Sequence, residues 1–351
     1  MLNQYILEPF DKVAKKCSEV GRFPEDDYRM AMSSSEVPES YWTQVGEADE
    51  SDRKIVIVGA QSVPMATTKS AFLAQTLAKP KKLTIKAPSP DEAILIRETL
   101  EYNKEFSNTE FFVYENKSEE LKSDGAWLRD LEEATDVVVF GGQETVSFFD
   151  KSYAEKASVH LHGPKFSFGI VDAESLESED NLAGLAGDFL SYYGEGCLSP
   201  RFYITIGDLT DDQMTYLVDC MKEEEEEIKE FRSKLPLSKK SLLVQQMTNS
   251  NYLAPYIRVS SFDSSEYLTP LFGDIRLINV DDPFMVEAFT ENFESMISTI
   301  ALEEEELGDL VAGWEVSIPR YCDIGSMQFP YFYEKFDVVD DFEIYGGVDY
   351  E

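Results

Sequence analysis

Short β-branched runs alternate with helix-like stretches from residue 54 to residue 171, and this alternation limits the fold more than any other feature of the chain. Each run has the length of a strand, and the stretches between the runs are long enough to be crossover helices. Parallel strands need such crossovers, so the pattern predicts a parallel sheet with helices on both faces. The predicted strands are 55–58, 82–86, 111–114, 136–140 and 168–171.

The predicted helices lie between and around these strands. An amphipathic pattern predicts a helix over residues 1–20, and residues 21–52 read as a polar, loop-rich segment. Ser89-Pro90-Asp91 is a good helix start before 92–102. From Lys165 onward a second α/β lobe is expected. The other predicted helices are 65–78, 123–134 and 211–233.

Cys197 occupies a turn of small residues, Gly194 to Arg201, between a helix-like stretch and a β-rich run at 202–206. A sulfur nucleophile needs an exposed position where backbone N–H groups can stabilise an oxyanion. The glycines on both sides of Glu195 permit close substrate approach and unusual φ values. The competing interpretation is that Cys197 is a small core residue, as most cysteines are.

Segments upstream of Cys197 favour the catalytic interpretation because they follow in a fixed order. This order and spacing resemble the aldehyde dehydrogenase superfamily and, more narrowly, its LuxC-type fatty acyl-CoA reductase branch. The resemblance runs from about residue 54 to residue 330. The segments that carry it are 55–64, 82–90, 136–145 and 159–167, with the branch-specific elements Gly163-Pro164-Lys165 with Ser167, Cys197-Leu198-Ser199-Pro200, and Pro319 to Pro330.

The resemblance implies an α/β, aldehyde dehydrogenase-like fold with two domains. Residues 1–163 would form a Rossmann-type NADP(H)-binding domain, to which residues 331–351 would return. Residues 164–330 would form an α/β catalytic domain that carries the nucleophilic cysteine. In such a sheet the ligand is expected at the carboxyl ends of the strands.

The number and spacing of the cysteines and histidines limit the kinds of site that the chain can form. The four cysteines lie far apart without a CxxC pair, and the chain has only two histidines. This usage indicates a reduced, cytoplasmic protein and argues against a metal site. The chain has no secretory segment near Met1 and no apolar run long enough to span a membrane.

The formal net charge of −37 excludes nucleic acids and anionic membrane surfaces as natural partners, because both would repel the chain. The acidic residues gather in clusters that read as solvated helix faces and a charged tail. A coenzyme A thioester and NADPH are also anionic, so their sites need local positive charge. Adaptation to a salty habitat is left open as a cause of the acidity.

Two segments match the cofactor-binding positions of the superfamily. Lys86 stands where a lysine contacts the adenosine ribose or its 2′-phosphate, and Ser89 stands where NAD-preferring relatives often have a glutamate. A carboxylate would repel a 2′-phosphate and a serine would not, so this pair favours NADPH. Gly141, Gly142 and Thr145 belong to the turn expected near the pyrophosphate, which suits the N–H groups of a helix start.

Three positions depart from the superfamily pattern. Ser62 stands near the expected oxyanion-hole asparagine, and its hydroxyl can donate a hydrogen bond. Leu161 and His162 replace the region of the general-base glutamate that hydrolyses an acyl-enzyme. Pro270 occupies the place of a glutamate that binds the nicotinamide ribose. The missing base fits reduction of an acyl thioester better than oxidation of an aldehyde, because hydride transfer needs no activated water.

The sequence therefore predicts reduction of a fatty acyl thioester by NADPH through an acyl-enzyme on Cys197, with His162 as a candidate proton donor. The alternative reading of His162 is a hydrogen-bonded structural residue. Alternative functions are an aldehyde dehydrogenase or a degenerate family member that acts as a binding subunit. The expected partners are an acyl-CoA or another acyl thioester and an acyl-protein synthetase or transferase; a homo-oligomer is left open.

Overall fold

The computed structural model describes most of the 351-residue chain in two compact units, which we treat separately. Unit 1 comprises Met1–Pro164 and Tyr331–Glu351, and unit 2 comprises Lys165–Pro330. The assignment of cofactor binding to one unit and catalysis to the other stays a prediction. The described residues are 6–7, 10–33, 37, 39–59, 63–115, 118–121, 123–174, 176, 178–249, 251–260, 269–303, 307–308, 311–328 and 341–346.

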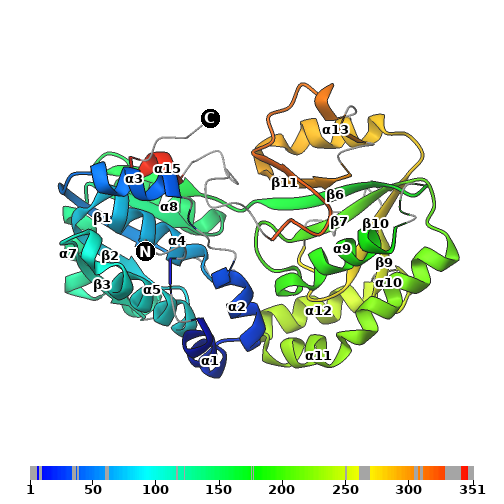
Figure 1. Ribbon diagram of the computed structural model, residues 1–351, viewed down its shortest axis with the longest axis horizontal. Helices are drawn as coiled ribbons and strands as arrows, with labels where there is room; N and C mark the ends of the chain where they lie inside the picture. The colour runs from blue at the N-terminus through cyan, green and yellow to red at the C-terminus, as the bar shows by residue number, and fades with distance from the viewer. Residues whose placement is uncertain are drawn as a thin grey trace. The chain divides into compact units, whose positions relative to one another are not determined.

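Unit 1 is built on a five-stranded parallel sheet with the order β3-β2-β1-β4-β5 (Figure 1). The strand order changes direction between β1 and β4, because the chain passes from β1 to β2 on one side and later from β3 to β4 on the other side of β1. Ligands of open α/β sheets bind at the carboxyl ends of the strands at such a switch point. The strands are β1 Ser51–Val58, β2 Pro80–Lys86, β3 Glu110–Tyr114, β4 Asp136–Phe140 and β5 Ser158–His162.

Helices cover this sheet on both faces, as the strand–helix alternation predicts. Val56 and Val58 of β1 pack with Trp127 and Leu131 of α7 and with Phe149 of α8. Strand residues alternate between faces, so Ile55 and Ile57 point to the opposite side. The helices are α4 Ala66–Leu73, which continues as the π-helix Ala74–Ala78, α5 Pro90–Tyr102, α6 Ser118–Leu121, α7 Gly125–Glu133 and α8 Gln143–Tyr153, with a 3₁₀ turn at Lys104–Phe106.

The polar segment 21–52 is not loop-rich, and this prediction was wrong. It holds two helices, α2 Glu25–Ser33 and α3 Glu39–Glu47, after α1 Phe10–Val20. Both begin with acidic residues, which suit a helix N-terminus. Tyr41 and Trp42 are buried, and the Tyr41 ring stacks on Phe72 of α4 with centroids 5.6 Å apart. A few large aromatic side chains therefore stabilise helices whose overall composition is polar.

The C-terminal helix α15, Asp341–Ile344, belongs to unit 1 and contacts it through specific polar bonds. Arg53 donates to the carbonyl of Ile344 at 3.1 Å and also forms an ion pair with Asp136 at 2.7 Å. The Tyr345 and Ser70 hydroxyls are 2.7 Å apart. These bonds connect the end of the chain to β1 and α4.

Unit 2 is built on a seven-stranded sheet with the order β12-β11-β6-β7-β10-β9-β8 (Figure 1). All neighbouring pairs are parallel except β8 and β9, which are antiparallel. Its elements are β6 Phe166–Asp172, α9 Glu179–Leu190, the 3₁₀ turn Ser191–Gly194, β7 Pro200–Ile206, α10 Asp211–Glu223, α11 Glu225–Lys234, α12 Leu237–Asn249, β8 Asn251–Ala254, β9 Ile257–Ser260, β10 Ile275–Val280, α13 Phe284–Phe293, the 3₁₀ turn Glu294–Met296, β11 Ile297–Leu302 and β12 Arg320–Cys322.

An aromatic cluster forms the core on one face of this sheet. Phe168 of β6 and Phe202 of β7 stack with centroids 5.2 Å apart, and Phe289 of α13 meets both rings edge-on. The predicted helix 211–233 is interrupted at Glu224, where α10 ends and α11 begins. None of the helices in the described ranges is both long and apolar enough to cross a membrane.

Glu92 of α5 caps the start of α4 in unit 1. Its carboxylate accepts N–H groups from Met65, Thr67 and Thr68 at 2.9 to 3.1 Å and the Thr68 hydroxyl at 2.9 Å. A carboxylate at this position satisfies the unpaired donors of a helix start. Burial raises the pKa of Glu92 from 4.5 to about 7, although the bonds from Thr68 and Met65 oppose this rise.

We expect Glu92 to make the protein less stable as pH rises from about 4.5 to 7. The folded state binds its proton more tightly than the unfolded state, so the stability it contributes is present at low pH and is lost through this window. The loss is on the order of 3 kcal/mol. Urea unfolding of wild type and Glu92→Gln across this range checks it, with Glu101→Gln, an exposed residue of the same helix, as the control. An unchanged pH slope in Glu92→Gln would contradict the expectation.

Candidate active site

The backbone before Cys197 adopts left-handed conformations at several consecutive positions. Tyr192 and Tyr193 have φ values of 52° and 53°, and Gly194 and Gly196 have 73° and 96°. Glycine adopts such angles without cost, but each tyrosine is strained by about 1–3 kcal/mol. The Tyr193 ring stacks on Phe231 of α11 with centroids 4.2 Å apart. Tertiary packing therefore imposes a turn that the local sequence does not favour.

Hydrogen bonds fix three carbonyl groups of this turn. Arg201, at the start of β7, donates to the carbonyls of Gly194 at 2.5 Å and Gly196 at 3.0 Å. The Ser167 hydroxyl donates to the carbonyl of Cys197 at 2.6 Å. In a trans peptide the N–H group points opposite to the preceding carbonyl. The N–H groups of Cys197 and Leu198 therefore point away from Arg201 and Ser167, respectively.

This arrangement gives the turn the donors that an oxyanion would need. Within the described residues, no hydrogen bond from the Leu198 N–H is found. The Cys197 side chain is half-buried, so part of it reaches solvent. Acyl transfer by a thiol requires backbone N–H groups beside the sulfur, so the turn is compatible with the predicted role of Cys197.

The electrostatics of the turn are set by Arg201 and Glu195. Burial lowers the pKa of Arg201 to about 10, while the nearby Cys197 and Glu195 raise it. Arg201 therefore remains charged at neutral pH, and its positive charge favours a thiolate at Cys197. Glu195 is buried and forms an ion pair with Lys239 of α12 at 2.7 Å. Lys239 thus offsets the carboxylate that would otherwise oppose thiolate formation.

Three segments that the sequence singles out as branch-specific meet at the cysteine turn. Ser167 follows Gly163-Pro164-Lys165, and its hydroxyl also accepts the N–H of Thr299 at 3.1 Å. Gln328, in the Pro319 to Pro330 segment, donates to the Ser199 hydroxyl at 2.6 Å, and Ser199 donates to the Glu195 carbonyl. The residues from these segments therefore form one hydrogen-bonded unit around Cys197.

Asp188 of α9 fixes the segment that carries Gln328. Its carboxylate accepts the N–H groups of Gly325 at 2.8 Å and Met327 at 3.1 Å and the hydroxyl of Tyr203 at 2.6 Å. Burial raises the pKa of Asp188 to about 6, and the bonds from Tyr203 and the two N–H groups oppose the rise. Asp188 is a positioning residue that the sequence patterns do not reveal.

In unit 1, the predicted glycine turn follows β4 at the switch point of the sheet. A Cβ atom at Gly141 would lie 2.9 Å from the Cβ of Thr145, so the turn requires glycine there. Gly142 is the N-cap residue of α8, and this helix start has no side-chain cap. By contrast, Glu92 caps α4, and Ser89 and Asp124 cap α5 and α7. The exposed N-terminus of α8 is thus suited to an anion.

The structure gives Lys86 and Ser89 local roles beyond the predicted ones. Lys86 ends β2 and is half-buried, and burial lowers the pKa of its amine. Ser89 is the N-cap residue of α5, where its hydroxyl accepts the N–H of Glu92 at 3.5 Å. Any change at position 89 therefore alters a helix cap as well as the local charge.

The remaining predicted residues are placed less favourably for the roles assigned to them. His162 is buried at the end of β5, its ring stacks on Phe140 with centroids 4.4 Å apart, and its carbonyl accepts the N–H of Gly141. This placement gives His162 a structural role in unit 1, and proton donation stays a prediction. Ser62 lies outside the described residues. Pro270 accepts a bond from Gln246 at 3.0 Å through its carbonyl.

We expect Arg201→Met to shift the pH midpoint of Cys197 alkylation upward by about 1–2 pH units, because an opposite charge nearby has this effect on an ionisable group. Iodoacetamide labelling at a series of pH values, read at the Cys197 peptide by mass spectrometry, measures the shift. Arg201→Lys retains the charge and should move the midpoint less. An unchanged midpoint in folded Arg201→Met would contradict the role of the guanidinium.

Comparisons with known proteins agree with this architecture. Residues 116–251 match the family model of the acyl-CoA reductase (LuxC), a region that includes the glycine turn, His162 and Cys197. No curated protein matches the chain.

Solved structures extend the likeness to almost the whole chain. An oxidoreductase from Marinobacter aquaeolei superposes with a TM-score of 0.68 at 10% identity, covering 96% of this chain and 78% of that one. An acetylating aldehyde dehydrogenase from Geobacillus thermoglucosidasius has a TM-score of 0.60 at 12% identity, covering 95% and 86%. An NADP-dependent enzyme from E. coli has a TM-score of 0.62 at 11% identity, covering 91% and 75%.

These findings confirm the resemblance that the sequence motifs indicate, in both the superfamily and the branch. The chain thus has the aldehyde dehydrogenase fold, and its residues 116–251 match the acyl-CoA reductase (LuxC) family.

Proposed function

We propose that this protein reduces a fatty acyl thioester to the aldehyde with NADPH, through an acyl-enzyme on Cys197. The observation that carries the proposal is the cysteine turn. Arg201 and Ser167 bond to its carbonyl groups, so the N–H groups of Cys197 and Leu198 point away from these two side chains, and we assign the substrate carbonyl to that side. A chain that served only as a scaffold would have no use for a strained turn held by so many bonds.

The first chemical step is acyl transfer to sulfur. The Cys197 thiolate attacks the carbonyl carbon of the thioester, and the N–H groups of Cys197 and Leu198 stabilise the oxyanion. The oxyanion then collapses and expels the coenzyme A thiolate, which takes a proton from solvent. Cys197 now holds the acyl group as a thioester, and after reduction it leaves as a thiolate while the aldehyde is released.

The residues of unit 1 fit a phosphorylated nicotinamide cofactor. The uncapped start of α8 suits its pyrophosphate, and Lys86 with Ser89 suits a 2′-phosphate because no carboxylate stands at position 89. When bound, NADPH supplies the hydride that reduces the acyl thioester. The proposed preference for NADPH over NADH rests only on the positive charge of Lys86 and on the missing carboxylate at position 89.

Positions 161 and 162 favour reduction over hydrolysis. A hydrolytic acyl-enzyme needs a carboxylate to activate water, and here Leu161 and the buried His162 lie at the end of β5. Loss of a general base slows such a step by about 10²- to 10⁴-fold. The acyl group is therefore expected to stay on Cys197 until hydride arrives.

The proposed substrate is an acyl-CoA, and the proposed protein partner is an acyl-protein synthetase or transferase that would deliver acyl groups. The described cysteines, including Cys17 and Cys197, are free thiols. Free thiols suit a reducing compartment, so we place the protein in the cytoplasm.

We expect incubation with a long-chain acyl-CoA, without cofactor, to leave one acyl group on the intact protein. Intact-protein mass spectrometry reads the adduct, and peptide mapping assigns it to Cys197. Adding NADPH should discharge the adduct as aldehyde at least about 100-fold faster than buffer alone.

Matched variants make this test specific. Cys197→Ala should abolish the adduct, whereas Cys322→Ala, a half-buried thiol in the same unit, should retain it. An adduct that survives Cys197→Ala would contradict the proposal. Rapid discharge in buffer with release of free fatty acid would point to hydrolysis instead.

We expect Ser89→Asp to weaken NADPH binding by about 10-fold or more while NADH binding changes little. Aspartate caps a helix as well as serine does, so the substitution adds charge without removing the cap. Ser89→Asn is the neutral control with the same shape. Fluorescence titration of the wild type and both variants with NADPH and NADH measures the six affinities. Equal losses for NADPH and NADH in Ser89→Asp would show that position 89 does not face the 2′-phosphate.

A further inference from the structure

A second loop of unit 2, residues 271–273, has the same left-handed backbone as the cysteine turn. Phe272 and Gly273, just before β10, have φ values of 55° and 87°. Within the described part of the chain, consecutive residues with positive φ occur only here and at residues 192–194. Glycine adopts such angles freely, but phenylalanine does not. The surrounding structure must therefore hold Phe272, which is fully buried, in a shape that the residue itself does not favour.

The 271–273 loop lies directly beside the backbone that precedes Cys197. A Cβ atom placed on Gly194 would lie 3.6 Å from the backbone nitrogen of Leu271, and one placed on Gly273 would lie 3.6 Å from the Tyr193 ring. Both are ordinary van der Waals distances. Gly194 is thus fixed by two neighbours, because Arg201 bonds to its carbonyl group and the loop lies beside its Cα atom.

Helix α11 contacts both of these strained segments with one face. Ile228, Phe231 and Arg232 are three and four residues apart, so they project from the same side of the helix. Phe231 stacks on the Tyr193 ring with centroids 4.2 Å apart. Ile228 lies against Gly273, where a Cβ atom would come within 3.0 Å of the isoleucine side chain. The helix therefore connects the 271–273 loop to the backbone before Cys197.

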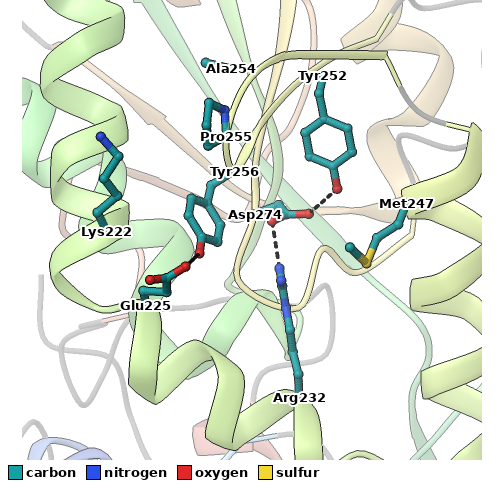
Figure 2. Close-up of a pocket in the computed structure, with 9 residues that line it drawn as sticks. All are labelled: Lys222, Glu225, Arg232, Met247, Tyr252, Ala254, Pro255, Tyr256 and Asp274. Carbon is teal, nitrogen blue, oxygen red and sulfur yellow. Dashed lines mark hydrogen bonds and ion pairs between the residues drawn. The ribbon is translucent and has the colours of Figure 1, made fainter.

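Arg232 makes the polar contacts between α11 and the loop. Its Nε donates to the carbonyl of Phe272 at 2.8 Å, and its Nη2 donates to the carboxylate of Asp274 at 2.7 Å. Figure 2 shows the bond to Asp274. The two acceptors stand on either side of Gly273 in the chain, so one guanidinium spans the strained residue. A planar guanidinium makes two such bonds in a fixed geometry, which an ammonium group cannot do.

Asp274 is also held by residues outside α11. Its carboxylate accepts the Nε–H of Arg258 at 2.8 Å and the hydroxyl of Tyr252 at 3.0 Å. Arg232 and Tyr252 border a cavity of about 760 Å³, which Figure 2 shows. Loss of the Arg232 guanidinium would therefore leave Asp274 with two partners and would bury no charge without one. The main effect of such a change would be to release the Phe272 carbonyl.

We infer that Arg232 is a positioning residue for the acylation of Cys197. It holds the 271–273 loop beside Gly194 and thereby keeps the N–H groups of Cys197 and Leu198 in the orientation that an oxyanion needs. This role rests on the proposed acyl-enzyme. Arg232 acts only through the backbone, so it affects the rate of acyl transfer and not the supply of thiolate.

Two reactions of Cys197 separate this role from a general effect on the fold. Attack on a thioester forms an oxyanion that the N–H groups of the turn stabilise. Alkylation by iodoacetamide displaces iodide from a saturated carbon and forms no oxyanion. A displaced N–H group therefore slows acylation but leaves alkylation unchanged. Intact-protein mass spectrometry of the full chain, with a long-chain acyl-CoA in the absence of cofactor and with iodoacetamide at the same pH, gives both rate constants.

Arg232→Met should lower the acylation rate by about 10- to 100-fold, as a small misplacement of catalytic groups does, and should change alkylation by less than about 2-fold. Gly273→Ala disturbs the same loop without changing a charge, because its Cβ atom would crowd Ile228 at a positive φ, and it should show the same difference between the two rates. Lys229→Met is the matched control. Lys229 is an exposed cation of α11 that pairs only with its helix neighbours Glu225 and Glu226, so neither rate should change.

Circular dichroism and thermal unfolding verify that each variant is folded, and either Arg232→Met or Gly273→Ala is sufficient for the test. Unchanged acylation in a folded loop variant overturns the role of Arg232 and leaves the proposed function intact. An equal fall of both rates, or an equal loss of acylation in Lys229→Met, overturns it in the same way. A wild type that alkylates but takes no acyl group overturns the proposed function together with this role.

Discussion

The buried guanidinium of Arg201 is the interaction on which the cysteine turn depends. Burying a cation has a large desolvation cost, and here the carbonyls of Gly194 and Gly196 solvate it in place of water. The same two bonds set the direction of the Gly194–Glu195 and Gly196–Cys197 peptide groups. Because the charge also faces Cys197, one side chain controls both the backbone geometry and the reactivity of the thiol.

The buried carboxylates of this acidic chain are each stabilised by hydrogen bonds from nearby groups. Glu92, Asp188 and Asp274 are all buried, and each accepts several hydrogen bonds within its own unit. Glu92 and Asp188 connect segments through backbone N–H groups, whereas Asp274 forms ion pairs with Arg232 and Arg258. Buried carboxylates here are structural connectors, and the exposed ones account for the net charge.

Much of the fold could be predicted from the sequence because the strands and most helices of unit 1 are local patterns. The alternation of 54–171 predicted a parallel sheet, and Ser89-Pro90 predicted the start of α5. The alternation did not predict β5, and the predicted strand 168–171 belongs instead to β6 of the unit 2 sheet. Helices α2 and α3 were not predicted, because a few buried aromatic residues stabilise them and they have no regular apolar period. The break between α10 and α11 at Glu224 was not predicted, because no glycine or proline stands there.

The candidate site was predictable only in part. Cys197 could be predicted as a site residue because glycines precede it. Arg201 lies four residues later, but nothing in the sequence indicates that it bonds to the turn. Gln328 and Lys239 act through contacts across 129 and 44 positions of the chain, which no local pattern encodes. The sequence interpretation of Ser89 was incomplete in another way. We interpreted Ser89 only through its effect on cofactor choice, but it is also the N-cap residue of a helix.

The strained conformation of Tyr192 and Tyr193 has a consequence for how the protein is made. The turn has no local preference for its shape, and the residues that hold it include Thr299 and Gln328, which leave the ribosome well after Cys197. A nascent chain cannot assemble the thiol's surroundings until those residues have emerged and packed. The hydrogen-bonded unit around Cys197 is therefore completed only after these later segments have been synthesised.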